Sequence, residues 1–197
     1  AADRGVRVRL LLDDLNSHDK DSLLVALDHH PNVEVRLFNP SRGRANSFGR
    51  GVEMLLRMVS LNRRMHNKAW IADNRVAVVG GRNVGDEYFG AAADTNFFDA
   101  DLTVVGPTVA ETSAIFDAFW NSRSAIPLEA LVTADDVSLA RLRRMGERHY
   151  TSDYAAPYLK RLEESPNVQS LLQGHRELHW TRDAHVYSDP PEKAEGA

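Results

Sequence analysis

The chain has 197 residues, of which 43% are hydrophobic and 26% are charged, and it contains no cysteine. These values are typical of a folded globular chain and exclude collagen-like, low-complexity and wholly disordered classes. The lack of cysteine excludes a disulfide framework, a cysteine-ligated zinc site, an iron–sulfur cluster and a thiol nucleophile. No apolar run approaches the roughly 20 residues that a membrane-spanning helix needs.

The net charge of −4 conceals an uneven distribution of charge along the chain. Residues 32–82 contain ten Lys or Arg and three acidic residues, whereas residues 83–117 contain seven acidic residues and no Lys or Arg. A basic segment of this kind can attract an anionic ligand. The alternative interpretation is a solvated basic face without a ligand.

The N-terminal part alternates between helix and strand signals. Residues 1–5 are typical of a helix end, with Gly5 as its C-cap, although no helix body precedes them. An apolar run predicts a strand over 6–12, leucines at helical spacing predict a helix over 19–30, and 33–38 is the next predicted strand. Because the chain also begins without Met, we expect it to be a fragment.

A polar loop, a helix and a hairpin are predicted next. Residues 39–46 are polar and contain Pro and Gly, and the apolar spacing over 48–62 predicts an amphipathic helix. Residues 65–72 and 76–79 have the pattern of two strands joined across 73–75. They therefore predict a β-hairpin.

Two more strands and three helices complete the predicted elements. Residues 102–105 predict a strand, and a helix follows through Trp120. Residues 133–164 have the pattern of two helices broken near 150–152, and 183–187 hint at a last strand. This alternation predicts an α/β fold with a largely buried sheet. Four aromatic residues are predicted to be core residues rather than lipid anchors: Trp70, Phe116, Phe119 and Trp120.

A group of polar residues surrounds the predicted hairpin. The period of two along a strand would place His66 and Lys68 on one face. The returning strand ends in Gly80 and Gly81, which allow a ligand to approach the backbone closely, and it delivers Asn83 at the same end. Imidazole, ammonium, amide and bare backbone together can form a phosphate site.

Such a site suits phosphoryl chemistry without a metal. Lys68 and Asn83 can hold a negative phosphodiester, while a neutral imidazole at His66 can act as nucleophile or proton donor near pH 7. A catalytic histidine needs a carboxylate on its other ring nitrogen. Asp99 is the first candidate for that carboxylate, and Asp101 is the second. The alternatives are that His66 is a structural histidine, that Lys68 forms a salt bridge and that Asp99 is an acid at the edge of a strand.

This pattern resembles the HKD signature of the phospholipase D superfamily. The matching residues, at the spacing of the signature, are His66, Lys68, Asp73, Gly80, Gly81 and Asn83. The acid at Asp99, with a strand and Gly106-Pro107 after it, resembles the downstream part of the family pattern. More narrowly, residues 11–16, 62–68 and 80–90 resemble the C-type bacterial cardiolipin synthases.

The resemblance implies a fold and an activity. The fold is a phospholipase D-like α/β sandwich, with a mixed β-sheet flanked by helices on both faces. The activity is that of a phosphatidyltransferase that works through a phosphohistidine intermediate and needs no cofactor and no metal. The implied product is cardiolipin, made from phosphatidylglycerol and a donor such as phosphatidylethanolamine.

The resemblance also implies roles for single residues. His66 would be the nucleophile or the leaving-group acid, and Asp99 would orient it. The phosphate would be bound by Lys68, Gly81 and Asn83, and Asp73 would have a structural role. The candidate catalytic residues are therefore His66, Lys68, Asn83 and Asp99.

The family uses two facing HKD motifs, in one chain or across a homodimer, whereas this chain has one. The sequence His18-Asp19-Lys20 copies the first part of the motif but lacks its Asp and its glycine pair, so we interpret it as a decoy. We expect residues 1–130 to be a catalytic half that lacks its first strand and helix. Residues 131–182 would be a mainly helical connection, and 183–197 the start of a second half or a disordered tail.

The implied partners are anionic and zwitterionic phospholipids and a second HKD half, in the same chain or a dimer mate. The implied location is the bacterial cytoplasm or the inner membrane, with peripheral membrane contact. Arg63, Arg64 and Arg82 could attract anionic lipid, with solvated or salt-bridging roles as the alternative.

Two other functions stay open from the sequence. One is a phospholipase D-type endonuclease that works as a homodimer, since the basic segment could bind a phosphate backbone. The other is a catalytically incomplete module that binds phosphate or lipid. The net charge of −4 counts against nucleic acid as a partner.

Overall fold

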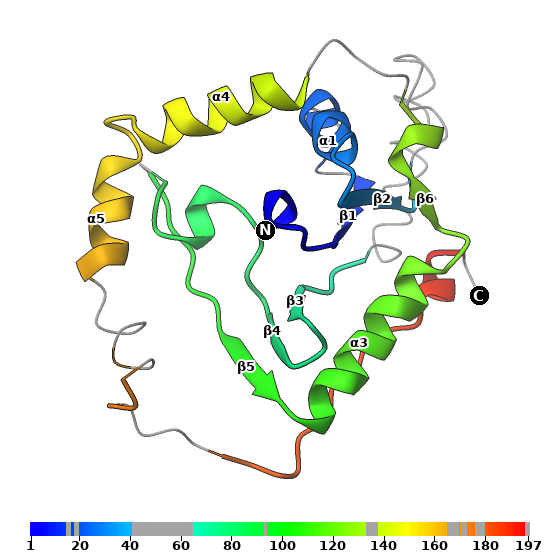
Figure 1. The fold of residues 1–197 in the computed structure, drawn as a ribbon. Helices are drawn as coiled ribbons and strands as arrows, with labels where there is room; N and C mark the ends of the chain where they lie inside the picture. Colours follow the sequence, from blue (N-terminus) through cyan, green and yellow to red (C-terminus); the bar gives the residue numbers. More distant parts are fainter. Residues whose placement is uncertain are drawn as a thin grey trace. The chain divides into compact units, whose positions relative to one another are not determined.

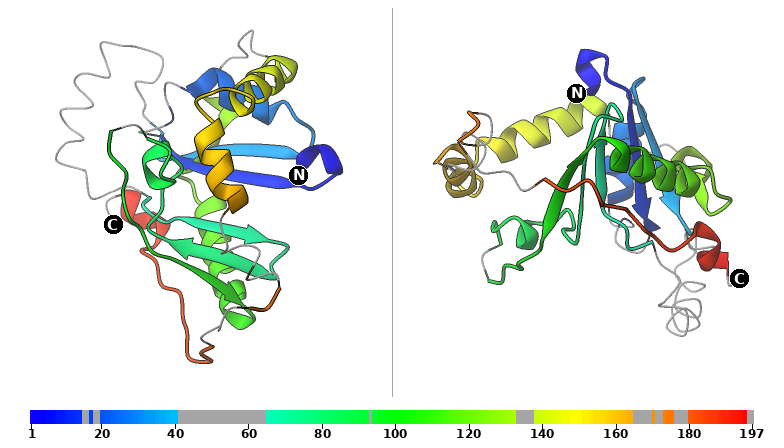
Figure 2. Two further views of the ribbon diagram at one scale, coloured as in Figure 1. Left: turned by 90° about the vertical axis from the view of Figure 1, so that its left-hand side faces the viewer. Right: turned by 90° about the horizontal axis from the view of Figure 1, so that it is seen from below.

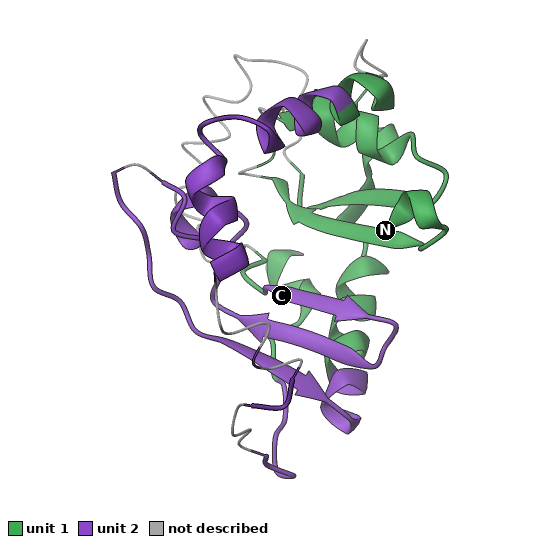
Figure 3. Cartoon of the chain, turned by 60° about the vertical axis from the view of Figure 1, so that its left-hand side comes forward, with its two compact units in different colours: residues 1–67, 112–143, 187–197 green, residues 68–111, 144–186 purple. Residues whose placement is uncertain are grey.

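A computed structural model describes residues 1–14, 17, 20–40, 65–92, 94–132, 138–164, 170, 173–175 and 180–195. The chain divides into two compact units, which are distinguished by colour in Figure 3. Unit 1 contains residues 1–67, 112–143 and 187–197, and unit 2 contains residues 68–111 and 144–186. The predicted helix over 48–62, most of the loop before it and the decoy at His18 lie outside the described residues.

The order of the elements along the chain can be followed in Figure 1. The strands are β1 (Val8–Asp13), β2 (Val33–Phe38), β3 (Ala69–Ala72), β4 (Val76–Gly80), β5 (Asp101–Val105) and β6 (Ala125–Pro127). The α-helices are α1 (Asp21–Asp28), α3 (Pro107–Trp120), α4 (Leu139–Tyr150) and α5 (Ala156–Glu164). Short 3₁₀ helices are formed by Ala2–Arg4, Asp86–Tyr88, Leu128–Ala130 and Pro191–Glu195.

The sheet of unit 1 is mixed. Strand β2 lies between β1, with which it pairs in parallel, and β6, with which it pairs antiparallel. Val8 pairs with Val33 and Asp13 with Phe38, so the two long strands are in register along their whole length. The expected helix end before β1 is a single 3₁₀ turn, closed by Gly5 at φ 85°.

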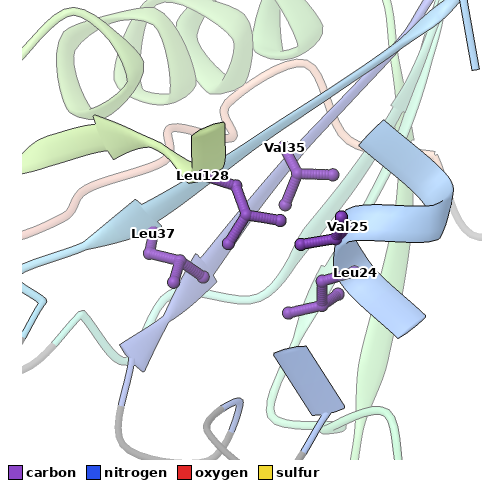
Figure 4. Close-up of a cluster of buried hydrophobic side chains, with 5 residues drawn as sticks. All are labelled: Leu24, Val25, Val35, Leu37 and Leu128. Atoms are coloured by element: carbon purple, nitrogen blue, oxygen red, sulfur yellow. The ribbon is translucent and has the colours of Figure 1, made fainter. Parts of the chain in front are cut away.

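Side chains of β2 alternate between the two faces of this sheet. Val35 and Leu37 are fully buried on one face, where they form a cluster with Leu24 and Val25 of α1 and with Leu128 (Figure 4). Burying five branched aliphatic side chains of this kind contributes about 1.5–3 kcal/mol each before the loss of chain entropy is counted. This cluster is the main core of unit 1.

The other face of the same sheet contacts the C-terminal half of α3. The rings of Phe38 and Phe119 lie 5.2 Å apart, and the Arg36 guanidinium lies 4.4 Å from the centre of the Trp120 ring. The predicted core roles of Phe119 and Trp120 are therefore confirmed. Helices cover both faces of this mixed sheet, as predicted.

Unit 2 contains a second sheet of three antiparallel strands, in the order β3-β4-β5 (Figure 2, left). The hairpin between β3 and β4 turns through Asp73 and Asn74, both at positive φ near 50°. Asp and Asn tolerate this left-handed conformation better than other non-glycine residues do. Trp70 is 68% exposed on this sheet, so its predicted core position is wrong.

The described residues after 137 include the α-helices α4 and α5, and the predicted break between them is confirmed at 151–155. The strand predicted over 183–187 is not formed. Instead, this extended segment binds α3, because the Glu111 carboxylate accepts hydrogen bonds from the Val186 amide and the His185 ring. None of the helices in the described ranges is both long and apolar enough to span a membrane. The α/β class is confirmed.

Candidate active site

The first two motif residues precede strand β3. The strand predicted over 65–72 starts too early, because β3 begins at Ala69. The alternation that would place His66 and Lys68 on one strand face therefore does not apply, and that prediction is wrong. A long hydrogen bond of 3.4 Å joins the Gly80 amide nitrogen to the Lys68 carbonyl oxygen, just before β3 begins. His66 is exposed, and Lys68 is half-buried.

His66 belongs to unit 1, where the preceding residue anchors it. Met65 packs against the buried cluster that contains Phe38 and Phe119. A small pocket of about 50 Å³ beside His66 is lined by Phe38, Met65, Asn67, Phe119 and residues of the C-terminal segment 189–194. The position of the imidazole in unit 1 therefore depends on the packing of Met65.

The glycine pair at the end of β4 lets this strand pass close to β5 in unit 2. A Cβ atom at Gly80 would lie 2.5 Å from the Ala100 carbonyl oxygen and 2.8 Å from the Asp101 Cα atom. A Cβ atom at Gly81 would overlap the Asp99 carboxylate. The neighbours of Gly80 include backbone atoms, so this position requires glycine, whereas the neighbour of Gly81 is a side chain that could rotate away.

Arg82, which follows the glycine pair, binds the start of β5. Its Nε donates a hydrogen bond to the Asp101 carboxylate at 2.5 Å, and its Nη2 donates to the Asp99 carbonyl oxygen at 3.1 Å. A further Nη1 contact reaches the Tyr88 carbonyl oxygen. The Arg82 and Asp101 side chains are only 30% and 22% exposed, which strengthens this charge-assisted pair. Arg82 therefore has the salt-bridging role that the sequence left as an alternative.

Asn83 is held by a residue of the loop that follows it. The Asn83 side-chain amide donates to the Tyr88 hydroxyl oxygen at 2.8 Å. The Tyr88 ring lies 5.2 Å from the ring of Phe97, and the Phe97 amide donates to the Glu87 carbonyl oxygen at 2.7 Å. The loop thus closes on itself and gives the Asn83 amide a defined partner.

The Asp99 carboxylate lies against the Gly81 backbone at the entrance to β5. Within the described part of the chain, no hydrogen bond or ion pair engages this carboxylate. The Asp101 carboxylate, the second candidate for orienting a histidine, is bound to Arg82 instead. Asp99 is therefore the acid of the two that keeps its oxygen atoms available for an imidazole.

The structure brings together four predicted site residues in unit 2. Lys68 joins the end of β4 through Gly80, and Gly81 contacts Asp99. Asn83 begins the loop directly after them. His66 belongs to unit 1, and its pairing with Asp99 stays a prediction.

One residue of this site, Tyr88, was not predicted from the sequence, and Asp101, the second candidate for the orienting acid, has a different partner from the one expected. Tyr88 is the partner of the Asn83 amide, and Asp101 is the partner of Arg82. Both lie inside segments that the family resemblance covers, 80–90 and the strand after Asp99, but spacing alone does not indicate which side chains meet. Across the described ranges, no group of three or more His, Asp or Glu residues is placed to hold a metal ion.

The comparison with protein-family models identifies the domain. Residues 1–120 match the model described as cardiolipin synthase, PLD-like domain. The chain belongs to this family. Cardiolipin synthase C of Escherichia coli K12 is 39% identical over 196 residues, which cover 100% of this chain and 41% of that protein. The resemblance to the C-type synthases is thus confirmed.

Other bacterial relatives of this PLD-like domain cover less of the chain. An uncharacterized protein of Helicobacter pylori is 43% identical over 134 residues, which are 68% of this chain and 26% of that protein. Cardiolipin synthase A of Pseudomonas fluorescens is 33% identical over 130 residues, which are 64% of this chain and 25% of that protein. The chain therefore spans between a quarter and two fifths of the length of these relatives.

Proposed function

We propose that this PLD-like domain is one catalytic half of a phosphatidyltransferase of the cardiolipin synthase type. The observation that carries the proposal is the family match over residues 1–120, because this range contains the complete pattern from His66 to Asn83 and the acid Asp99. The identity to cardiolipin synthase C over the whole chain favours this reaction over the endonuclease and the inactive binding module.

The proposed reaction exchanges one alcohol for another on a phosphodiester. The His66 imidazole attacks phosphorus, so that a nitrogen–phosphorus bond forms while the bond to the leaving alcohol breaks, and the leaving oxygen takes a proton from the second motif. The acceptor hydroxyl then attacks phosphorus and the nitrogen–phosphorus bond breaks. The hydroxyl proton passes to the group of the second motif that gave up its proton in the first step. His66 could equally serve as the acid, with the second motif as nucleophile.

The other motif residues stabilise the charge that moves in these steps. The Lys68 ammonium and the Asn83 amide would bind the non-bridging phosphate oxygens. The bare backbone at Gly81 lets the phosphate approach, and Asp99 would fix the tautomer of the imidazole. Asp73 supports the proposal differently, because its left-handed conformation closes the hairpin turn, which suits a structural role.

The proposal includes partners and a location. We expect phosphatidylglycerol as the acceptor and a lipid such as phosphatidylethanolamine as the phosphatidyl donor. We expect the protein to lie in the bacterial cytoplasm or at the inner membrane, with peripheral membrane contact. The facing motif would come from elsewhere in the same protein or from a dimer mate. Residues 1–130 would be the catalytic half, 131–182 the helical connection and 183–197 the beginning of the second half or a tail.

The test measures cardiolipin formation in vesicles of phosphatidylethanolamine and phosphatidylglycerol. The full-length protein, this chain and their His66→Ala variants are compared, and His175→Ala serves as the control because His175 is an exposed histidine outside the motif. We expect activity in the full-length protein, a loss of at least about a thousandfold with His66→Ala, and normal activity with His175→Ala. Plasmid DNA in a parallel assay should stay intact.

The same assay separates the ways in which the second motif is supplied. Activity in this chain alone would indicate that a homodimer completes the site, and activity confined to the full-length protein would indicate that one chain carries both motifs. If the folded full-length protein forms no cardiolipin from these two lipids, the proposal is overturned.

A further inference from the structure

The loop that follows Asn83 is tied to the helical region by two side chains. The Tyr154 hydroxyl donates a hydrogen bond to the Asp86 carboxylate at 2.9 Å. The Arg161 guanidinium donates to the Gly90 carbonyl oxygen. Tyr154 lies in the turn before α5, and Arg161 lies within that helix. All these residues belong to unit 2, so the contacts join segments about 70 residues apart in sequence within one compact unit.

These two contacts flank the residue that receives the Asn83 amide. Asp86 begins the 3₁₀ turn Asp86–Tyr88, and Gly90 follows that turn at φ 69°. Tyr88 lies between them in the chain, and its hydroxyl accepts the Asn83 hydrogen bond. A displacement of the loop at either end therefore moves the partner of Asn83.

A hollow of about 540 Å³ lies between α5 and the end of this loop. Its lining consists of Gly90, Ala91, Ala92, Asn96, Tyr154, Pro157, Tyr158, Lys160, Arg161 and Glu164. Tyr154 and Arg161 are thus the lining side chains that donate hydrogen bonds to the loop, and the Tyr154 hydroxyl has a second, longer contact of 3.4 Å to the Ala91 carbonyl oxygen. The loss of either side chain should therefore loosen the loop.

The Tyr154 phenol must be protonated to donate this hydrogen bond. The hydrogen bond to the Asp86 carboxylate raises the pKa of the Tyr154 phenol, with the negative charge of Asp86 and desolvation acting in the same direction. The phenol therefore stays protonated and donates throughout the neutral and mildly basic range.

We propose that Tyr154 and Arg161 are positioning residues that hold the segment 86–90 and thereby orient the Asn83 amide toward the substrate phosphate. The proposal rests on the proposed function in one respect, namely that Asn83 binds that phosphate. It extends the site into the helical region, which lies beyond the family match to residues 1–120.

The first test reads the Asn83 amide directly and needs no activity. The side-chain amide signal of Asn83 is identified in a ¹⁵N-resolved NMR spectrum of this chain by its loss in Asn83→Ala. Tyr154→Phe and Arg161→Met should shift this signal and speed its exchange with solvent. Tyr150→Phe and Lys160→Met are the matched controls, since Tyr150 is exposed at the end of α4 and Lys160 pairs with Glu164. An Asn83 signal that is unchanged in a folded Tyr154→Phe protein would overturn the proposal.

The second test measures phosphatidyl transfer in the full-length protein. We expect Tyr154→Phe to lower kcat about tenfold and to change KM less than about twofold, because the amide is displaced while lipid binding elsewhere persists. In an Asn83→Ala background, Tyr154→Phe should lower the activity no further. In the protein that keeps Asn83, Arg161→Lys should retain part of the activity that Arg161→Met loses.

The outcomes of the two tests are distinguishable. Full additivity of Tyr154→Phe and Asn83→Ala would indicate a role independent of Asn83 and would overturn the positioning proposal. If the wild-type protein forms no cardiolipin, the proposed function fails, and the NMR measurement alone then decides whether Tyr154 and Arg161 orient Asn83.

Discussion

At the scale of single residues, the glycines of this domain differ sharply in the space around them. Gly80 faces atoms of Ala100 and Asp101, and Gly81 faces the Asp99 carboxylate, at distances that no Cβ atom can accept, whereas Gly146 in α4 has no atom within 4 Å of its Cβ position. The cost of adding one methyl group therefore depends on backbone neighbours rather than on glycine as such.

This difference predicts opposite effects of Gly→Ala substitutions. Gly80→Ala must move the backbone of β5 and should lower the free energy of unfolding by about 1–3 kcal/mol or more. Gly146→Ala should raise it by about 0.5–1 kcal/mol, because alanine favours a helix interior. Urea unfolding monitored by circular dichroism measures both values. Equal effects at the two positions would contradict the close approach of β4 and β5.

Gly81→Ala separates stability from catalysis. The added methyl group meets the Asp99 side chain, which can rotate away, so we expect a smaller loss of stability than in Gly80→Ala. A rotated Asp99 could no longer orient an imidazole, so transfer activity should fall by at least tenfold. A Gly81→Ala protein of full activity would argue against Asp99 as the orienting acid.

At the scale of elements, the segment 183–186 is bound by two side chains of α3, the Thr108 hydroxyl, which donates to the Ala184 carbonyl oxygen, and the Glu111 carboxylate. The hydrogen bond from the Val186 amide lowers the pKa of Glu111, and the hydrogen bond from His185 lowers it further. The folded-state pKa thus lies below the ordinary value of 4.5. A group of this kind contributes stability that is present above the unfolded pKa and is lost as the pH falls through the folded pKa.

We therefore expect this segment to detach from α3 in acid. The protection of the Val186 amide against exchange, taken relative to the intrinsic exchange rate at each pH, should be present at neutral pH and be lost as the pH falls below about 4.5. Glu111→Gln should make the same segment labile already at pH 7, since a neutral amide is a weaker acceptor. Protection of Val186 that is unaffected by Glu111→Gln would show that other contacts hold the segment.

Hydrophobic pattern predicted some elements well and others not. The strand over 33–38 was predictable because Val33, Val35 and Leu37 alternate with Glu34 and Arg36, and this period of two is typical of a strand. Strand β6 has three residues and includes Pro127, so it offers no period to detect. Residues 183–187 have strand-like composition, yet their backbone partners are side chains of α3 rather than a strand.

The residues of the candidate site were likewise predictable from the sequence only in part. Motif spacing was sufficient to select His66, Lys68, Asn83 and Asp99 as candidates. The pairing of Asn83 with Tyr88 depends on how a loop folds over five residues, and the support from Tyr154 depends on a contact across about 70 residues of sequence. No local period encodes such contacts, because each joins single side chains from segments without regular structure.

At the scale of the whole molecule, the domain assignment explains why one motif is insufficient. The chain matches 41% of cardiolipin synthase C, and the proposed chemistry needs both a nucleophile and an acid at one phosphorus atom. A single imidazole cannot be deprotonated to attack and protonated to donate in the same step. The proposed enzyme must therefore obtain a second titratable group from a second motif, elsewhere in the same protein or in a dimer mate.

The ion pair between Arg82 and Asp101 has a consequence for how lipid reaches this site. Its positive charge lies next to the proposed phosphate-binding residues, but Asp101 neutralises it. Arg82→Gln should therefore lower the melting temperature, through a loss of about 2 kcal/mol, and leave KM for phosphatidylglycerol nearly unchanged. The rate should likewise respond weakly to added salt. The substrate headgroup would then arrive by lateral diffusion along the lipid surface, with little long-range electrostatic steering from Arg82.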